Sequence, residues 1–193
     1  MYHAGTFSFM NHLSKKTGIA LFLVIHVSGI FCQEQERDKS PTAFTLALCQ
    51  MEVVGGDREY SLAHAGEMIA EAAGQEADLV LLPEAMDLGW THPSALTEAE
   101  PVPEGRTFTF LAQLARKHRV YICSGLIEKE GEKVYNSAVF IDPRGELLLL
   151  HRKINELDIG HPYYDLGDRL NVCETEFGTI GLVICADAFA QVL

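Results

Sequence analysis

Short apolar runs alternate with amphipathic segments in the first half of the sequence. Phe44–Cys49 (FTLALC), Asp78–Leu82 (DLVLL) and Val120–Ser124 have the length and composition of buried strands. Asp57 can cap a helix that runs to about Gly74, and a second helix is predicted over Thr107–His118. The apolar face of the first helix consists of Leu62, Ala65, Ile69 and Ala72. We therefore expect these helices to pack against a sheet.

In the second half, apolar runs are separated by short polar turns, as in antiparallel hairpins. The predicted strands are Leu126–Lys129, Val134–Ile141, Glu146–Lys153, Leu170–Glu174 and Thr179–Cys185. Strand–helix alternation followed by hairpins predicts one α/β layered domain over residues 43–193.

The beginning of the sequence has a different pattern. Lys15 and Lys16 precede the apolar run 18–27, and small residues follow, so that residues 1–32 resemble a secretory signal peptide starting at Met1 or Met10. The run is shorter than the roughly 20 residues of a stable membrane span. Residues 33–42 form a polar linker. An exported protein, periplasmic or secreted, is predicted, with a cytoplasmic location as the alternative.

Charge and cysteine usage narrow the range of partners. The 193 residues carry a net charge of −12, which would repel phosphate backbones, so no nucleic-acid partner is expected. The five cysteines form no CxxC pair and have no histidine at metal-ligand spacing. No metal site is therefore predicted.

Three polar side chains follow apolar strands at places suited to chemistry. Glu84 comes directly after LVLLP, at the carboxyl end of a strand, where a carboxylate can act as a general base. Lys153 ends the run LLLLHRK, and its ammonium could stabilise negative charge on a reacting carbonyl. Cys185 closes TIGLVIC and precedes a turn, as an exposed nucleophile would. Alone, Glu84 also fits an exposed loop residue, Lys153 a basic strand end that reaches solvent, and Cys185 a buried core cysteine.

Together, the runs LLPE, HRK and GLVICAD resemble, in this order, the Glu-Lys-Cys motifs of the nitrilase superfamily of carbon-nitrogen hydrolases. The segments YNSAVFID and DLGDRLNVCETEFGTIG belong to the same resemblance. It implies a four-layer α-β-β-α sandwich, a catalytic triad of Glu84, Lys153 and Cys185, no cofactor, and assembly into homo-oligomers. Family domains continue well beyond the cysteine, so that residues 43–193 would be the N-terminal part of such a domain, incomplete at its C-terminus.

The implied function is hydrolysis of a small amide, carbamoyl compound or nitrile through a cysteine thioester. Many members have a second glutamate after the lysine, and Glu156, Asp158 or neither residue takes that place here. Two alternatives remain open. The chain could be an inactive domain that serves in binding or oligomerisation, or a thiol hydrolase in which His151 or His161 activates Cys185.

Overall fold

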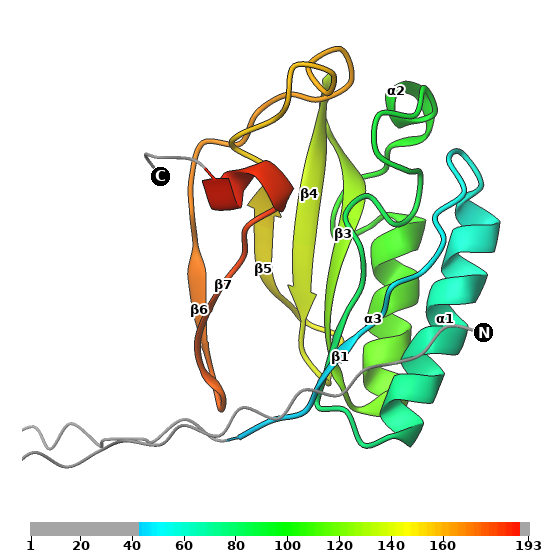
Figure 1. The fold of residues 1–193 in the computed structure, drawn as a ribbon, viewed down its shortest axis with the longest axis vertical. Helices are drawn as coiled ribbons and strands as arrows, with labels where there is room; N and C mark the ends of the chain where they lie inside the picture. The colour runs from blue at the N-terminus through cyan, green and yellow to red at the C-terminus, as the bar shows by residue number, and fades with distance from the viewer. Residues whose placement is uncertain (1–42, 190–193) are drawn as a thin grey trace, which may run out of the picture.

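A five-stranded mixed sheet forms the centre of the computed structural model, which describes residues 43–189. The strands lie side by side in the order of the sequence (Figure 1): β1 (Leu46–Leu48), β2 (Leu79–Leu81), β3 (Tyr121–Glu130), β4 (Lys133–Ile141) and β5 (Leu147–Arg152). β1, β2 and β3 are parallel, whereas β4 and β5 continue the sheet antiparallel. The sheet thus changes from crossover connections to hairpins at β3.

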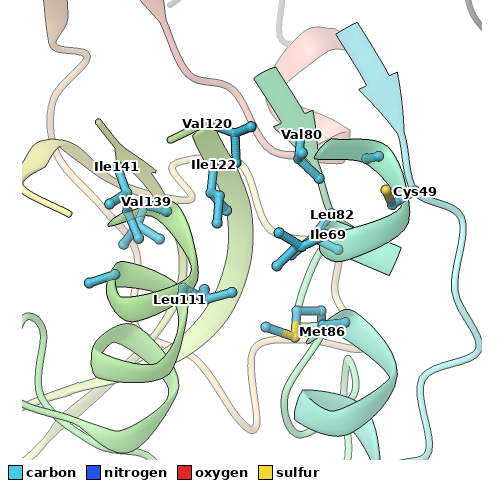
Figure 2. Close-up of a cluster of buried hydrophobic side chains, with 14 of the residues drawn as sticks. Cys49, Ile69, Val80, Leu82, Met86, Leu111, Val120, Ile122, Val139 and Ile141 are labelled. Carbon is cyan, nitrogen blue, oxygen red and sulfur yellow. The ribbon is translucent and has the colours of Figure 1, made fainter. Parts of the chain in front are cut away.

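Two helices cover one face of this sheet (Figure 1): α1 (Arg58–Gly74) and α3 (Arg106–His118). The Asp57 side chain caps α1 by accepting a hydrogen bond from the Tyr60 backbone N–H at 3.0 Å. Side chains of both helices meet those of the central strands in the main hydrophobic core (Figure 2), which includes Ile69, Val80, Met86, Leu111, Ile122 and Val139. This burial anchors the strand ends from which the polar residues extend.

A two-stranded ribbon lies on the opposite face of the sheet, formed by β6 (Val172–Thr175) and β7 (Gly178–Gly181) (Figure 1). The ring of Phe177, between the two strands, packs 5.1 Å from the Tyr121 ring and 4.6 Å from the Phe44 ring, measured between centroids. After β7 the chain returns towards β5 and forms a short 3-10 helix, η1 (Cys185–Phe189). A one-turn helix, α2 (Ala95–Glu98), completes the elements.

The predicted helices and most strands are confirmed, with two corrections. Residues 120–124 and 126–129 were expected as separate strands, but β3 runs through Gly125 without a break. The last predicted strand was expected to reach Cys185, but β7 ends at Gly181 and Cys185 begins η1.

The architecture is α/β, as predicted. Of the four predicted layers, residues 43–189 provide a helix layer, the main sheet and the β6–β7 ribbon. The expectations for residues 1–32 and 33–42 lie outside the described residues. Within residues 43–189, no helix is both long and apolar enough to cross a membrane.

Candidate active site

Glu84 is positioned by an unusually close approach between its segment and β3. Gly125 donates its backbone N–H to Pro83 O at 3.0 Å and accepts from Met86 N at 3.2 Å. A Cβ atom at position 125 would lie 2.5 Å from Glu84 Cα, so that only glycine permits this contact. Ala85 then turns the chain with a left-handed φ of 48°. The backbone around Glu84 is thus fixed from both sides.

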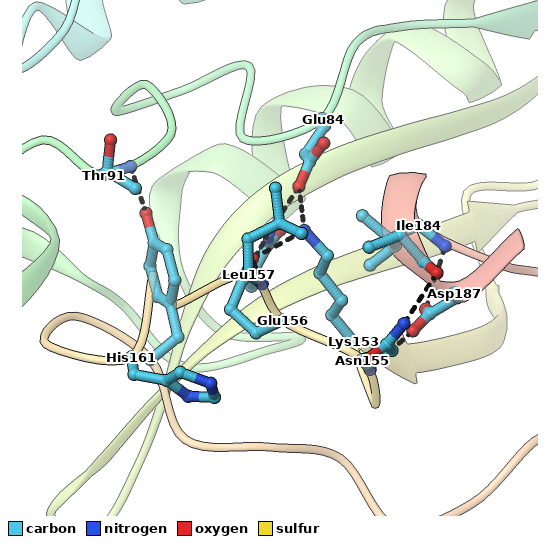
Figure 3. A network of polar contacts seen from close by, with 12 residues as sticks. Glu84, Thr91, Lys153, Asn155, Glu156, Leu157, His161, Ile184 and Asp187 are labelled. Atoms are coloured by element: carbon cyan, nitrogen blue, oxygen red, sulfur yellow. Dashed lines mark hydrogen bonds and ion pairs between the residues drawn. The ribbon is translucent and has the colours of Figure 1, made fainter. Parts of the chain in front are cut away.

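Lys153 extends from the end of β5 towards Glu84 (Figure 3). Its backbone N–H donates to Asn136 O at 2.8 Å, which continues the pairing with β4 by one residue. The side chain is 1% exposed, and its Nζ lies 2.9 Å from Glu84 Oε1 and 2.8 Å from Glu156 Oε1. The ammonium is therefore held between two carboxylates in a nearly dry setting.

Asn136 completes this group by bridging the same two carboxylates. Its Nδ2 donates to Glu84 Oε1 at 2.7 Å and to Glu156 Oε2 at 3.2 Å. Burial alone would lower the pKa of Lys153, but the hydrogen bonds to Glu156 and Glu84 outweigh it and raise that pKa above its ordinary value. Lys153 is consequently a fixed cation throughout the neutral range.

Cys185 lies on an exposed turn next to this group. It is the first residue of η1 and has a left-handed φ of 46°, a backbone conformation that residues other than glycine rarely adopt. Within residues 43–189 its thiol makes no hydrogen bond to Glu84 or Lys153. The connection runs through Asp187, whose Oδ1 accepts from the backbone N–H groups of Ile154 at 3.1 Å and Asn155 at 2.7 Å (Figure 3). The turn is thus hydrogen-bonded to the two residues that directly follow Lys153.

An aromatic residue and a loop contact border the group. The Lys153 ammonium lies 5.5 Å from the centre of the Trp90 ring, within the range of a cation–π contact. Next to Trp90, the Thr91 backbone N–H donates to the hydroxyl of the buried Tyr164 at 2.9 Å (Figure 3). Burial raises the pKa of Tyr164 to about 12, so that this hydroxyl stays neutral. This hydrogen bond joins the loop of Trp90 and Thr91 to the loop of Tyr164.

The predicted Glu84 and Lys153 are in contact, and Cys185 lies on a neighbouring turn. Of the two residues considered for the second glutamate, Glu156 contacts Lys153, whereas the side chain of Asp158 is fully exposed. The sequence assigns no role to Asn136 or Asp187, although they lie within the segments YNSAVFID and GLVICAD, respectively. Asn136 reaches Glu84 and Glu156 only because β4 pairs with β5, and Asp187 reaches the residues around Lys153 only through the course of the chain after β7.

The histidine hypothesis is not supported. His151 Nε2 lies 2.8 Å from Asp187 Oδ2, and His161 is 4.0 Å from Asp158. Among the described residues neither ring hydrogen bonds to Cys185. In the same part of the chain, no three His, Cys, Asp or Glu side chains are grouped as metal ligands would be.

Comparisons with known proteins identify the relatives of this chain. The profile of the family described as "Carbon-nitrogen hydrolase" matches residues 45–191. A "Nitrilase" of Pyrococcus abyssi is 38% identical over 142 residues, which cover 72% of this chain and 53% of that protein. A chloroplastic omega-amidase of Arabidopsis thaliana is 31% identical over 166 residues, or 79% of this chain and 45% of the relative. The chain spans about half the length of the curated relatives it matches.

Solved structures confirm the nitrilase-type fold. Nit3 of Saccharomyces cerevisiae, a member of branch 10 of the nitrilase superfamily, superposes with a TM-score of 0.69 at 25% identity, covering 75% of this chain and 56% of that one. The CN-hydrolase superfamily protein XC1258 of Xanthomonas campestris gives 0.70 at 23% identity, with coverages of 77% and 56%. With the family profile matching most of its residues, the chain belongs to the carbon-nitrogen hydrolase family.

Proposed function

We propose that this protein hydrolyses a non-peptide carbon–nitrogen bond of a small amide, carbamoyl compound or nitrile through a thioester on Cys185. The observation that carries the proposal is the placing of the buried Lys153 ammonium between Glu84 and Glu156, beside a turn that exposes a cysteine. Relatives named as nitrilase and omega-amidases support the reaction class.

In the first step, written for an amide, Glu84 takes the thiol proton and the Cys185 sulfur attacks the carbonyl carbon. The C=O π electrons move onto oxygen, where Lys153 and the Ala186 backbone N–H stabilise the negative charge. The tetrahedral intermediate collapses, the C–N bond breaks, and the nitrogen leaves as ammonia or an amine with the proton from Glu84. A thioester remains on Cys185.

In the second step, Glu84 removes a proton from a water molecule that attacks the thioester carbon. The C–S bond then breaks, and the sulfur recovers the proton. The product is a carboxylic acid. Lys153 stays positively charged through both steps because its two carboxylate partners hold the proton on it.

The role of Glu156 in this scheme follows from its contacts. It receives a hydrogen bond from Lys153 at 2.8 Å and one from its neighbour's backbone, Leu157 N, at 2.9 Å. Because Glu156 Oε1 already accepts these two hydrogen bonds, we assign Glu156 the role of orienting Lys153. Glu84 is then the carboxylate that takes and returns protons during the reaction. This division fits the exposures, because the Glu84 side chain is 25% exposed and that of Glu156 only 1%.

Ammonia release from a panel of small aliphatic amides tests the proposal on the 193-residue chain. We expect release that Cys185→Ala abolishes and that Cys173→Ala retains, since Cys173 is a half-buried cysteine of β6. A glutamate-to-leucine mutant of an amidase from Nesterenkonia sp. AN1 shows covalent addition of the acetamide moiety of fluoroacetamide at its active-site cysteine. The same reagent should therefore label Cys185, as read by peptide mass mapping. Turnover that survives Cys185→Ala would contradict the proposal.

A further inference from the structure

The Asp187 carboxylate accepts more hydrogen bonds than the proposed chemistry uses. Oδ1 accepts from the backbone N–H groups of Ile154 and Asn155, at 3.1 and 2.7 Å. Oδ2 accepts from Ile184 N at 3.0 Å and lies 2.8 Å from His151 Nε2. The side chain itself is fully buried. Such a carboxylate holds several segments of backbone at once.

One set of these contacts closes the turn that contains the nucleophile. Asp187 donates its own N–H to Ile184 O at 2.9 Å, while its side chain accepts from Ile184 N. Ile184 and Asp187 are thus linked by two hydrogen bonds that run in opposite directions. Cys185 and Ala186 lie between them, and Cys185 keeps its left-handed φ within this closed turn. Strain of this kind persists only where surrounding contacts over-determine it.

The other set joins this turn to the lysine. Ile154 and Asn155 directly follow Lys153, and the Asn155 side chain adds a hydrogen bond from Nδ2 to Ala186 O at 2.9 Å. His151 lies two residues before Lys153 in β5. Asp187 therefore contacts the chain on both sides of Lys153 as well as the turn of Cys185. Figure 3 shows its contacts with Ile184 and Asn155.

Both oxygens of Asp187 are occupied by backbone donors, and this makes the carboxylate hard to replace. Burial alone would raise the pKa of Asp187, but the hydrogen bonds from His151, Asn155 and Ile184 outweigh it and keep the pKa below its usual value. In either orientation, the amide of an asparagine would direct its NH2 group at a backbone N–H. One of the two attachments must then be lost.

We propose that Asp187 is a positioning residue, which fixes the distance and orientation of the Cys185 sulfur relative to Lys153 and Glu84. This inference rests on the proposed function. Asp187 acts through its contacts with the turn and with β5, and it does not touch the reacting atoms. Because the thiol makes no direct hydrogen bond to Glu84 or Lys153 in the described residues, its place is set by this carboxylate. A displacement of about 1 Å can cost on the order of 10²-fold in rate.

Asp187→Asn tests this role against a matched control, Asp142→Asn. Asp142 is also buried and also holds a turn, since its Oδ1 accepts from Arg144 N and Glu146 N, both at 2.9 Å. It lies at the end of β5 that is remote from Lys153. The assay measures kcat and KM for amide hydrolysis, the rate of fluoroacetamide addition to Cys185, and the thermal midpoint of each chain.

We expect Asp187→Asn to lower kcat and the fluoroacetamide rate by about 10²-fold with little change in KM, and Asp142→Asn to change neither. Equal losses in the two variants, or a kcat for Asp187→Asn within twofold of the parent, would overturn the inference. If Asp187→Asn does not fold, the kcat of Asn155→Ala tests whether the attachment of the turn to the residues after Lys153 matters for catalysis. This substitution removes only the hydrogen bond to Ala186 O and should lower kcat a few-fold, and an unchanged kcat overturns the inference. Turnover in Cys185→Ala would contradict the proposed function itself, whatever Asp187→Asn shows.

Discussion

Lys153 Nζ lies 2.8 Å from Glu156 Oε1, and each of the two side chains is 1% exposed. A buried ion pair of this kind is costly to form and more costly to break from one side. With Glu84 at 2.9 Å on the same ammonium, the group has one positive and two negative charges, so that loss of the ammonium would leave both carboxylates without an ionic partner.

Glu156→Gln should weaken catalysis without abolishing it. The amide keeps the size of the side chain but removes the charge that orients Lys153 and supports its proton. We expect kcat/KM to fall by about 10- to 100-fold, since a hydrogen bond to a charged group contributes about 1.5–3 kcal/mol. Steady-state kinetics on a small amide measure this. Asp158→Asn is the control, because that exposed carboxylate should be dispensable. Similar losses in both variants would show that Glu156 has no particular role.

Lys153→Met should destabilise the fold in a pH-dependent manner. Removing the cation leaves two carboxylates without their partner, at a cost of about 3–5 kcal/mol in the free energy of unfolding near pH 8. The pKa of Lys153 is raised in the folded state, so its contribution is fully present below the unfolded-state pKa of about 10.5. That contribution is lost as the pH rises through the folded-state pKa.

Urea unfolding of the parent and Lys153→Met between pH 8 and pH 11 measures the difference. Tyr121 and Tyr164, whose pKa values are also raised, occur in both chains and cancel in the comparison. We expect the gap between the two chains to narrow above about pH 10.5. A gap that stays constant or widens at alkaline pH would be inconsistent with a stabilised ammonium.

Gly125→Ala should disturb Glu84 from within the sheet. The new Cβ would meet backbone atoms at 2.5 Å (Glu84 Cα) and 2.6 Å (Ala85 N), which cannot move as a flexible side chain would. Overpacking of this kind costs about 1–3 kcal/mol, and kcat should fall with it. Gly74→Ala is the control, since nothing lies within 4 Å of its added Cβ at the end of α1. Thermal melts and the kinetics of amide hydrolysis measure the stability and the kcat of both variants. Equal melting temperatures and equal kcat values for the two variants would contradict a close contact between Gly125 and Glu84.

Tyr164→Phe should loosen the loop that holds Trp90. The change removes the acceptor for Thr91 N, which has a left-handed φ of 60°, and leaves a partly buried donor unpaired. We expect a loss of about 1–3 kcal/mol in the free energy of unfolding and a higher KM with a smaller change in kcat. Tyr163→Phe is the control, because the Tyr163 hydroxyl makes no hydrogen bond within residues 43–189. Should Tyr163→Phe raise KM equally, the Tyr164 contact would not be responsible.

Much of the fold could be predicted because its elements depend on local patterns. The Asp57 cap and the apolar face of α1 are properties of neighbouring residues, and the turns between β3, β4 and β5 depend on short polar segments. The break expected at Gly125 was wrong for a non-local reason. The glycine serves a contact with Glu84 and does not interrupt the strand.

The site was predictable only in part, for a similar reason. Glu84, Lys153 and Cys185 each follow an apolar run, and this can be recognised in the sequence. The choice between Glu156 and Asp158 depends on which side chain turns inwards after β5, and spacing alone does not determine that. The roles of Asn136 and Asp187 likewise come from strand pairing and from the course of the chain after β7.

The Glu84–Lys153 pair joins residues that are 69 positions apart in the sequence. Closing so long a loop costs entropy that is recovered only after β2, β3, β4 and β5 have aligned. We therefore expect the charged group to form late when the chain refolds. Trp90, the single tryptophan of the sequence, lies 5.5 Å from that ammonium. The change in Trp90 fluorescence during refolding should therefore report when the Glu84–Lys153 contact forms.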